Sequence, residues 1–129
     1  MKRRWTIRLA DAAGQDYQAV LRWTVETFGR AQARTYAKTL TSALQDLSQG
    51  PTLAGVRPRD EIGPGIHTLH VARHGRKGRH FIVFRIDPVP DNPVIEVLRL
   101  LHDSMDLPRH LSAANESVAD PGISADPHH

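Results

Sequence analysis

Hydrophobic residues alternate with polar ones at the start of the chain and then recur at helical spacing. Trp5, Ile7 and Leu9 alternate with polar residues, which predicts a half-buried strand. From about residue 11 to residue 28 apolar side chains recur every three or four positions, and Gly29 stands where a helix C-cap is expected. One side of this helix carries Tyr17, Val20, Leu21, Val25 and Phe28. We expect that side to face the core.

A second helical pattern follows almost at once. It covers residues 33–47 and is stopped by Gly50 and Pro51. Because the connection around Gly29 is short, the two helices should form an antiparallel hairpin. The next segment, residues 51–65, holds three prolines and three glycines. It should be an ordered loop that leads from the helices to a sheet.

Three strand-like runs follow this loop. They cover residues 66–72, 80–86 and 94–101, and the segments between them, HGRKGR and DPVPDNP, are rich in turn-forming residues. Such loops join antiparallel neighbours, so the three runs should form a meander. The order strand, helix, helix, strand, strand, strand predicts a two-layer α+β fold. In it a helical hairpin packs on a mostly antiparallel four-stranded sheet, and the other face of the sheet stays open.

Composition limits the domain organisation and part of the chemistry. The chain has 129 residues, of which 40% are hydrophobic, and this fits one domain with one modest core over residues 1–111. Residues 112–129 are small, polar or broken by proline, so we expect a disordered tail there. The chain has no cysteine, which excludes disulfides and thiolate metal sites.

Charge and hydropathy narrow the partners and the location. The net charge is +3 and the pI is about 9.8, so the protein should favour a nucleic acid, an acidic peptide or an acidic protein surface. No apolar run approaches the ~20 residues that span a bilayer, and the N-terminus lacks the apolar segment of a signal peptide. We expect a cytoplasmic protein without membrane association.

Four motifs occur in a fixed order along the chain. The helices carry TVETFG and AQARTYAKTLTSALQDL, the next strand begins in IGPGIHTLHV, a later strand reads RHFIVFRI, and the chain continues as VLRLLHDSMDLPRHL. Over residues 5–111 these motifs resemble the ParE branch of the RelE/ParE toxins, the toxin halves of bacterial type II toxin–antitoxin modules. The last motif is the most specific. The loops HGRKGR and DPVPDNP look longer than in the shortest members, and the tail has no counterpart.

The resemblance implies a function and a set of partners. ParE-type toxins bind DNA gyrase and trap it in a DNA-cleaved state. They have no catalytic centre of their own, and no cofactor, metal or small-molecule substrate is expected. A cognate acidic antitoxin should neutralise the protein in a hetero-oligomer. The residues expected to contact a partner are Arg85, Arg99, His102, Met105 and Arg109.

The sister RelE type has the same fold and cuts messenger RNA on the ribosome. That reaction needs a base for the ribose 2′-hydroxyl, cations for the phosphate, an acid for the leaving oxygen and usually an aromatic that stacks a base. The candidates here are Arg85, Arg99 and His102, with His80 as a further one. Neither tyrosine lies in the sheet half and Lys77 is the only lysine after the helices, so this basic and aromatic set is thin. Gyrase inhibition is favoured, and a plain nucleic-acid-binding module would explain the charge but none of the motifs.

The two strand arginines have structural explanations as well. Alternation should turn Ile82 and Phe84 toward the helices and Arg85 to the open face, where it is either an anion contact or an ordinary solvated arginine. Arg99 has apolar neighbours on both sides, so its charge needs water, a carboxylate or a partner. Glu96 is the nearest acidic residue, but odd spacing sends it to the opposite face. Arg99 is therefore the stronger functional candidate.

The segment after the last strand has its own interpretation. His102 is either hydrogen-bonded to a nearby backbone group or carboxylate, which is favoured, or catalytic. Asp106 is placed to cap a short helical turn that holds Arg109. Such a turn would lead the chain away without a glycine, and Met105 and Leu111 could then pack back on the sheet.

The histidines of HTLHVARH raise the question of a metal site. On a strand His67 and His70 point to opposite faces, whereas His70 and His74 share one. No acidic residue lies within the strand to complete a ligand set. We therefore predict no metal site.

Trp23 is the one large aromatic that falls off the apolar face of the first helix. It either covers the loop from Pro51 onward or belongs to a partner surface, and the sequence leaves both open.

Overall fold

The computed structural model describes residues 4–87 and 93–105, and these residues form two helices and five strands. The elements in chain order are β1 (Thr6–Leu9), α1 (Asp11–Phe28), α2 (Arg30–Leu47), β2 (Arg57–Pro58), β3 (Ile66–His70), β4 (His80–Asp87) and β5 (Val94–His102). The predicted α+β class is confirmed. Both helices and the three strands of the meander lie where the hydrophobic periodicity places them.

The strands form one mixed sheet with the order β1-β5-β4-β3-β2. β1 is parallel to β5, and the other three pairs are antiparallel, so the sheet is mostly antiparallel as predicted. The sequence predicts four strands instead of five, because β2 has only Arg57 and Pro58, too few residues to show alternation. Trp5 lies just ahead of β1, and its N–H donates to the Ser48 carbonyl at 2.8 Å.

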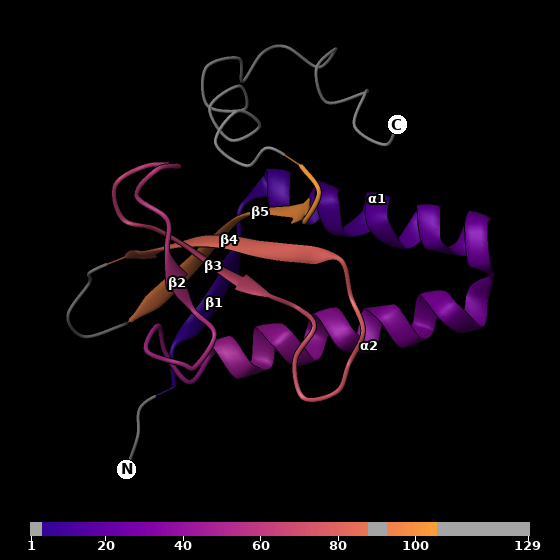
Figure 1. The fold of residues 1–129 in the computed structure, drawn as a ribbon, viewed down its shortest axis with the longest axis horizontal. Coiled ribbons are helices and arrows are strands. Elements are labelled where there is room, and N and C mark those ends of the chain that lie inside the picture. Colours follow the sequence, from indigo (N-terminus) through magenta and orange to yellow (C-terminus); the bar gives the residue numbers. More distant parts are fainter. Residues whose placement is uncertain (1–3, 88–92, 106–129) are drawn as a thin grey trace.

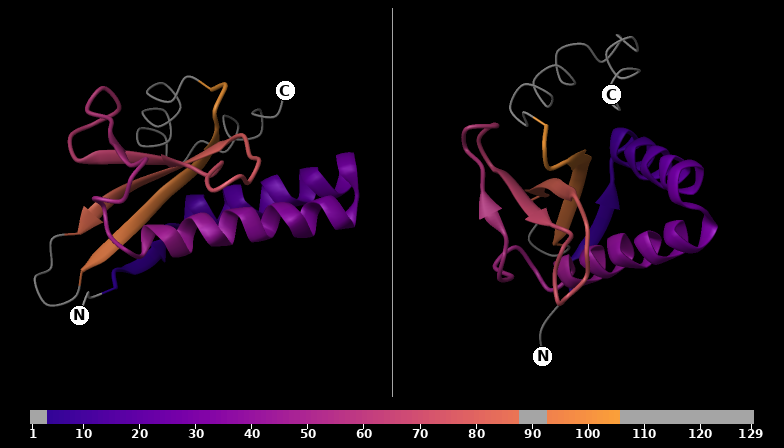
Figure 2. Two further views of the ribbon diagram at one scale, coloured as in Figure 1. Left: turned by 60° about the horizontal axis from the view of Figure 1, so that its bottom comes forward. Right: turned by 45° about the vertical axis from the view of Figure 1, so that its right-hand side comes forward.

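Gly29 makes the turn between the two helices. Its φ of 95° lies in the left-handed region, which glycine adopts without strain. Its N–H donates to the Val25 carbonyl at 2.9 Å, and its own carbonyl accepts from the Ala33 N–H at 3.1 Å. One residue thus ends α1 and begins α2, which confirms the predicted hairpin. The helices meet at this turn, beyond the sheet, and spread apart toward the strands (Figures 1 and 2).

The main core lies between the helical hairpin and one face of the sheet. It is made of Ala13, Leu40, Ala43, Leu47, Leu69, Val71, Ile82, Phe84, Ile95, Val97 and Leu100. Ile82 and Phe84 of β4 face the helices, as alternation predicts. Burying one large apolar side chain contributes roughly 1.5–3 kcal/mol, so this cluster is the main source of stability.

α1 is less buried than its pattern predicts. Its buried residues are Ala13 and Thr24, and the Thr24 hydroxyl donates to the Val20 carbonyl of its own helix at 2.7 Å. Val25 is 40% exposed and Phe28 is 63% exposed. The prediction that both face the core is wrong, because the last turns of α1 extend beyond the sheet (Figure 1).

The opposite face of the sheet carries a second, smaller core. Ile66, Val83 and Leu101 are buried there, and the side chains packed against them are Ile62, Phe81, Leu98 and Met105. The segment around Ile62 doubles back through backbone bonds from the Arg59 N–H to the Ile66 carbonyl at 2.8 Å and from the Ile62 N–H to the Arg59 carbonyl at 2.9 Å. The prediction of an open face is therefore wrong on this part of the sheet.

Several predictions lie outside the described residues. These are the disordered tail over residues 112–129, the cap made by Asp106 and the packing of Leu111. Within the described chain, neither helix is long and apolar enough to cross a membrane.

Candidate functional site

Arg99 is held by a carboxylate from the first helix. Its Nε donates to Asp16 Oδ2 at 2.7 Å and its Nη2 donates to Asp16 Oδ1 at 3.0 Å. The side chains of Arg99 and Asp16 are only 18% and 17% exposed. The sequence analysis leaves water, a carboxylate or a partner for this charge, and in the structure it is a carboxylate of the same chain. The prediction that Glu96 does not pair with Arg99 also agrees with the structure, since Glu96 binds Arg85 and Arg8 instead.

Asp16 also completes the edge of the sheet. β1 pairs with β5 only as far as Val97, and the Ala10 N–H then donates to the Val97 carbonyl at 2.9 Å as the chain enters α1. Beyond that point the Leu100 N–H of β5 donates to Asp16 Oδ2 at 2.9 Å. A side chain of α1 therefore takes the place of the strand residue that β1 is too short to supply.

Arg85 lies on β4, directly opposite Glu96 of β5. Its Nε donates to Glu96 Oε1 at 2.8 Å and its Nη2 lies 2.7 Å from the same oxygen. The Arg85 side chain is 59% exposed. The sequence analysis expects Arg85 to be either a contact for an external anion or an ordinary solvated arginine. Arg85 is in fact exposed and forms an ion pair across the strands.

His70, Arg79 and Asp103 form a polar contact at the far end of the sheet. The Ala72 N–H donates to His70 Nδ1 at 3.0 Å, so the ring carries its proton on Nε2, which donates to Asp103 Oδ2 at 3.0 Å. Arg79 Nε donates to Asp103 Oδ1 at 3.1 Å. Burial alone would raise the pKa of Asp103, but these hydrogen bonds from His70 and Arg79 lower it below the usual value.

His80 is bonded to the second helix at the same end of the sheet. Its Nδ1 lies 2.7 Å from the Tyr36 hydroxyl, which accepts the Arg79 N–H at 3.1 Å. Burial, and next the neighbouring His102, lower the pKa of His80 to about 4, so the ring is neutral at pH 7 and accepts the Tyr36 proton. Burial raises the pKa of Tyr36.

His102 stands opposite His80 on β5, and the two ring centroids are 5.3 Å apart. The Ser104 N–H donates to His102 Nδ1 at 3.1 Å, and the Ser104 hydroxyl lies 2.7 Å from the same atom. A hydrogen bond from nearby backbone is the structural role that the sequence analysis favours, and the geometry supports it. The chain then turns after His102, with the Met105 N–H bonded to the His102 carbonyl at 3.1 Å.

The remaining predicted contact residues divide between two regions. Met105 packs against the second core and is half-buried, so it stabilises the sheet face there. Arg109 lies outside the described residues. The structure thus distributes the candidates along the sheet without gathering them into one pocket.

The histidines of the β3 region are separated by the fold. His67 stacks on Phe84 and His70 lies edge-on to Phe81, so these two face opposite sides as predicted. His74 lies after β3 with a φ of 53°, and its Nε2 is 3.6 Å from Asp46 of α2. The prediction that His70 and His74 share a strand face is wrong, because β3 ends at His70 and His74 lies in the turn that follows. Within residues 4–87 and 93–105 no three potential metal-ligating residues gather.

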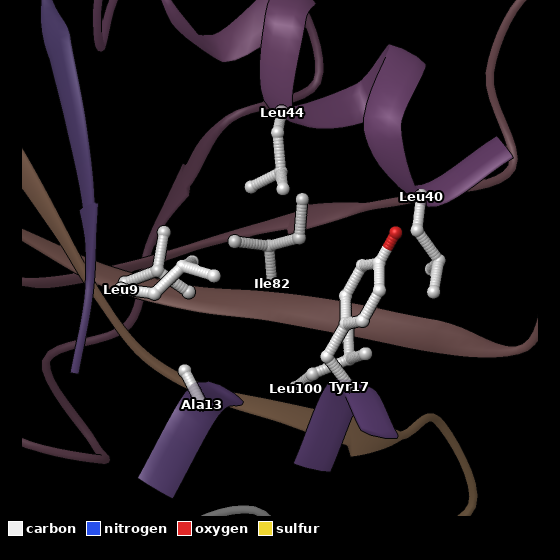
Figure 3. A pocket seen from close by; sticks show the side chains of 8 residues that line it. Leu9, Ala13, Tyr17, Leu40, Leu44, Ile82 and Leu100 are labelled. Carbon is white, nitrogen blue, oxygen red and sulfur yellow. The ribbon is translucent and has the colours of Figure 1, made fainter. Parts of the chain in front are cut away.

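An apolar groove opens where the two helices spread apart over the sheet. It is lined by Leu9, Ala13, Tyr17, Leu40, Leu44, Ile82, Val97 and Leu100 (Figure 3). Tyr17 and Thr41 bridge the helices with a hydroxyl contact of 3.3 Å. Leu9 is 42% exposed at this groove. The floor of this groove is core, because Leu40, Ile82, Val97 and Leu100 are at most 7% exposed. The groove is therefore shallow, and its rim at Leu9 is the part that offers apolar surface to a partner segment.

A second exposed apolar group lies at the hairpin tip. Trp23 is 48% exposed and packs edge-on against Phe28, with ring centroids 5.6 Å apart. The hypothesis that Trp23 covers the loop from Pro51 onward is wrong, because α1 ends at the opposite end of the hairpin from that loop (Figure 1). The indole of Trp5 instead packs over Gly50, where an added Cβ would lie 3.0 Å from Nε1.

The arrangement does not assemble the residues proposed for RNA cleavage. Arg85 lies five residues from His80 along β4, which corresponds to roughly 17 Å at ~3.4 Å per residue. Arg85 and Arg99 are both neutralised by carboxylates of this chain. His80 and His102 are close together, but Nδ1 of each ring is already hydrogen-bonded within the chain, that of His80 to Tyr36 and that of His102 to Ser104.

Solved structures that share this fold include three toxin–antitoxin proteins. The chromosomal ParDE system from Pseudomonas aeruginosa aligns with a TM-score of 0.61 and 19% identity over 77% of this chain and 96% of that one. The YoeB/ParE toxin from Agrobacterium tumefaciens aligns with a TM-score of 0.53 and 12% identity over 75% of this chain and 96% of that one. The RelBE2 toxin–antitoxin complex from Mycobacterium tuberculosis aligns with a TM-score of 0.52 and 21% identity over 78% of this chain and 99% of that one. The architecture is that of the RelE/ParE-like toxins.

Sequence similarity then resolves the branch within this class. Residues 7–107 match the family described as ParE toxin of type II toxin-antitoxin system, parDE. The toxin ParE1 from two strains of Mycobacterium tuberculosis is 30% identical over 103 residues, which cover 80% of this chain and 94% of the relative. The chain belongs to the ParE family of type II toxins.

The first prediction concerns Asp16. Asp16→Ala leaves the half-buried Arg99 charge and the Leu100 N–H without their acceptor, so the free energy of unfolding should fall by about 2–3 kcal/mol. Arg85→Ala removes an exposed ion pair and should cost at most about 1 kcal/mol. Urea denaturation at pH 7 measures both. Equal losses in the two variants would show that Asp16 has no special structural role.

The second prediction concerns the pH dependence of stability. Between pH 6.5 and about 4 His80 is protonated in the unfolded chain but not in the folded chain. The free energy of unfolding should therefore decrease by about 3 kcal/mol as the pH is lowered through this window. Above pH 6.5 the effect is absent, and below pH 4 it levels off. His80→Asn keeps an acceptor for Tyr36 but removes this titration. If denaturation between pH 7.5 and 4 gives both proteins the same pH slope, the neutral buried His80 is ruled out.

Proposed function

We propose that this protein acts in the bacterial cytoplasm as an inhibitor of DNA gyrase and is neutralised by a cognate antitoxin. Membership of the ParE family supports this activity, and the ion pairs of Arg85 and Arg99 carry the argument against a nuclease. A ribonuclease needs cations free to bind the scissile phosphate, whereas these two already bind carboxylates. A toxin that works by binding another enzyme needs no such free site.

One observation favours the alternative, a RelE-type ribosome-dependent ribonuclease. His80 and His102 face each other with ring centroids 5.3 Å apart, and two neighbouring imidazoles are the kind of pair that can move a proton to and from a phosphodiester. The adjacent Arg79 has a side chain that is 70% exposed, although Asp103 already binds it. This pair is the place where such an activity would reside.

A paired assay separates the two functions. The purified protein should block supercoiling by gyrase and accumulate gyrase-linked DNA breaks, and it should leave ribosome-bound messenger RNA intact. In cells, expression without the antitoxin should arrest growth and induce the DNA-damage response. Shortened transcripts with intact DNA would instead identify the ribonuclease, and His80→Asn with His102→Asn should then abolish the cleavage.

The apolar groove is our candidate for the antitoxin site. Its lining is almost entirely apolar and Leu9 is exposed at its rim, so the apolar face of an amphipathic antitoxin helix could pack over Leu9 and point a side chain into the groove. Acidic residues beside that face would suit the basic toxin. A segment that is disordered when alone could fold as it binds, giving a toxin–antitoxin hetero-oligomer.

A groove variant tests this assignment. Leu9→Glu places a charge on the groove lining and should lower the affinity for the antitoxin at least tenfold, because burying an unpaired carboxylate is costly. Phe28→Glu makes the same kind of change at the hairpin tip and should leave binding unchanged. Co-purification and growth rescue by the product of the neighbouring gene measure the effect. Equal loss in both variants, or no loss with Leu9→Glu in a folded protein, would refute the groove as the site.

A further inference from the structure

The exposed face of α2 is basic and polar. Its exposed residues are Arg30, Ala31, Gln32, Arg34, Thr35, Lys38, Thr41 and Gln45. The set contains three cations and four hydrogen-bonding side chains, and its only apolar member is an alanine. The single carboxylate of α2, Asp46, lies near the end of the helix, where it binds Arg73.

The three cations form a regular row. Arg30, Arg34 and Lys38 follow one another at intervals of four residues, so they are about 6 Å apart along the helix axis and within roughly 80° around it. The groove-lining residues Leu40 and Leu44 lie about 120° and about 80° around the helix from Arg34, the middle of the row. The row therefore faces solvent beside the groove and does not point into it.

Many arginines of the described chain are paired with a carboxylate, whereas the three cations of this row are not. Arg8, Arg59, Arg73, Arg79, Arg85 and Arg99 each lie within ion-pair distance of a carboxylate. Among the residues that the structure describes, no carboxylate lies within that distance of Arg30, Arg34 or Lys38. Their charge is thus available to an external anion.

We propose that the exposed face of α2, with Arg30, Arg34 and Lys38 at its centre, binds the phosphate backbone of duplex DNA. Arginine, lysine, threonine and glutamine are the side chains that make most contacts to phosphate. A protein partner would need large apolar anchors, and this face has none. A single strand would need aromatic side chains for stacking, and none is exposed on α2. The inference goes beyond gyrase inhibition, because the contact requires only the toxin and DNA.

The test measures binding of the full-length protein to a fluorescein-labelled 20-base-pair DNA duplex by anisotropy between 50 and 200 mM KCl. Three phosphate contacts predict a slope of about −2.7 for the logarithm of the association constant against the logarithm of salt concentration. Arg30→Gln/Arg34→Gln/Lys38→Gln should weaken binding at least tenfold at 50 mM KCl and flatten the slope. The matched control Arg4→Gln/Arg57→Gln/Lys77→Gln removes equal charge from exposed positions elsewhere and should bind as the unmodified protein does.

Several results would overturn the proposal. These are no binding by the unmodified protein at 50 mM KCl, equal losses in the two triple variants, or tighter binding to single-stranded DNA or to duplex RNA. If the α2 variant keeps its DNA affinity but loses the antitoxin, the row serves an acidic protein and the proposal is wrong. Should that variant fail to fold, Thr35→Glu/Gln45→Glu repels phosphate from the same face at two exposed positions and must also lower the affinity at least tenfold.

Discussion

The contact between Asp16 and the open edge of β5 determines how the two layers of this protein fit together. β1 is four residues long, so the last part of β5, although paired with β4 on one side, has no strand on the β1 side. Asp16 fills that gap: its carboxylate accepts one hydrogen bond from the Leu100 N–H and two from the Arg99 side chain. An unpaired strand edge would invite pairing with other chains, so the contact protects the edge and fixes α1 against it.

The position of α1 has a consequence for the other helix. With α1 held at the edge of β5 and α2 packed on the main core through Leu40 and Leu47, the helices are joined at Gly29 and spread apart toward the sheet (Figure 2). Their separation produces the apolar groove, and it leaves the polar face of α2 exposed beside it. The two proposed binding surfaces are therefore products of one packing arrangement.

Local patterns in the sequence are sufficient to predict the elements but not their long-range contacts. Helical spacing, the glycine at position 29 and the alternation in β4 are all encoded within a few residues, and the structure agrees with them. The bond between Asp16 and Arg99 joins residues 83 positions apart, and nothing in either segment points to the other. The second core was equally hidden, because the segment around Ile62 has no periodicity and owes its position to backbone bonds.

A bulge explains why simple alternation fails near the candidate site. Val83 pairs with Arg99 and Phe84 pairs with Val97, so Leu98 has no partner on β4. Glu96 lies opposite Arg85 and Arg99 lies opposite Val83, so the two share a face of the sheet. The prediction that odd spacing sends them to opposite faces is wrong, because the bulge adds a residue between them. Tyr36 and Asp103, which organise the histidines, also escape prediction, because they approach from α2 and from the turn after β5.

The central structural claim is that Arg99 stabilises the fold and does not bind a substrate. Asp16→Asn/Arg99→Gln tests it, because the amide of residue 16 still accepts the Leu100 N–H while both charges are gone. Each single change should destabilise the protein, and the double variant should recover at least about 1 kcal/mol relative to the sum of the two. If Arg99 is structural, the double variant should inhibit gyrase as strongly as the unmodified protein. A double variant that is folded and stable yet inactive would contradict it and return Arg99 to the functional surface.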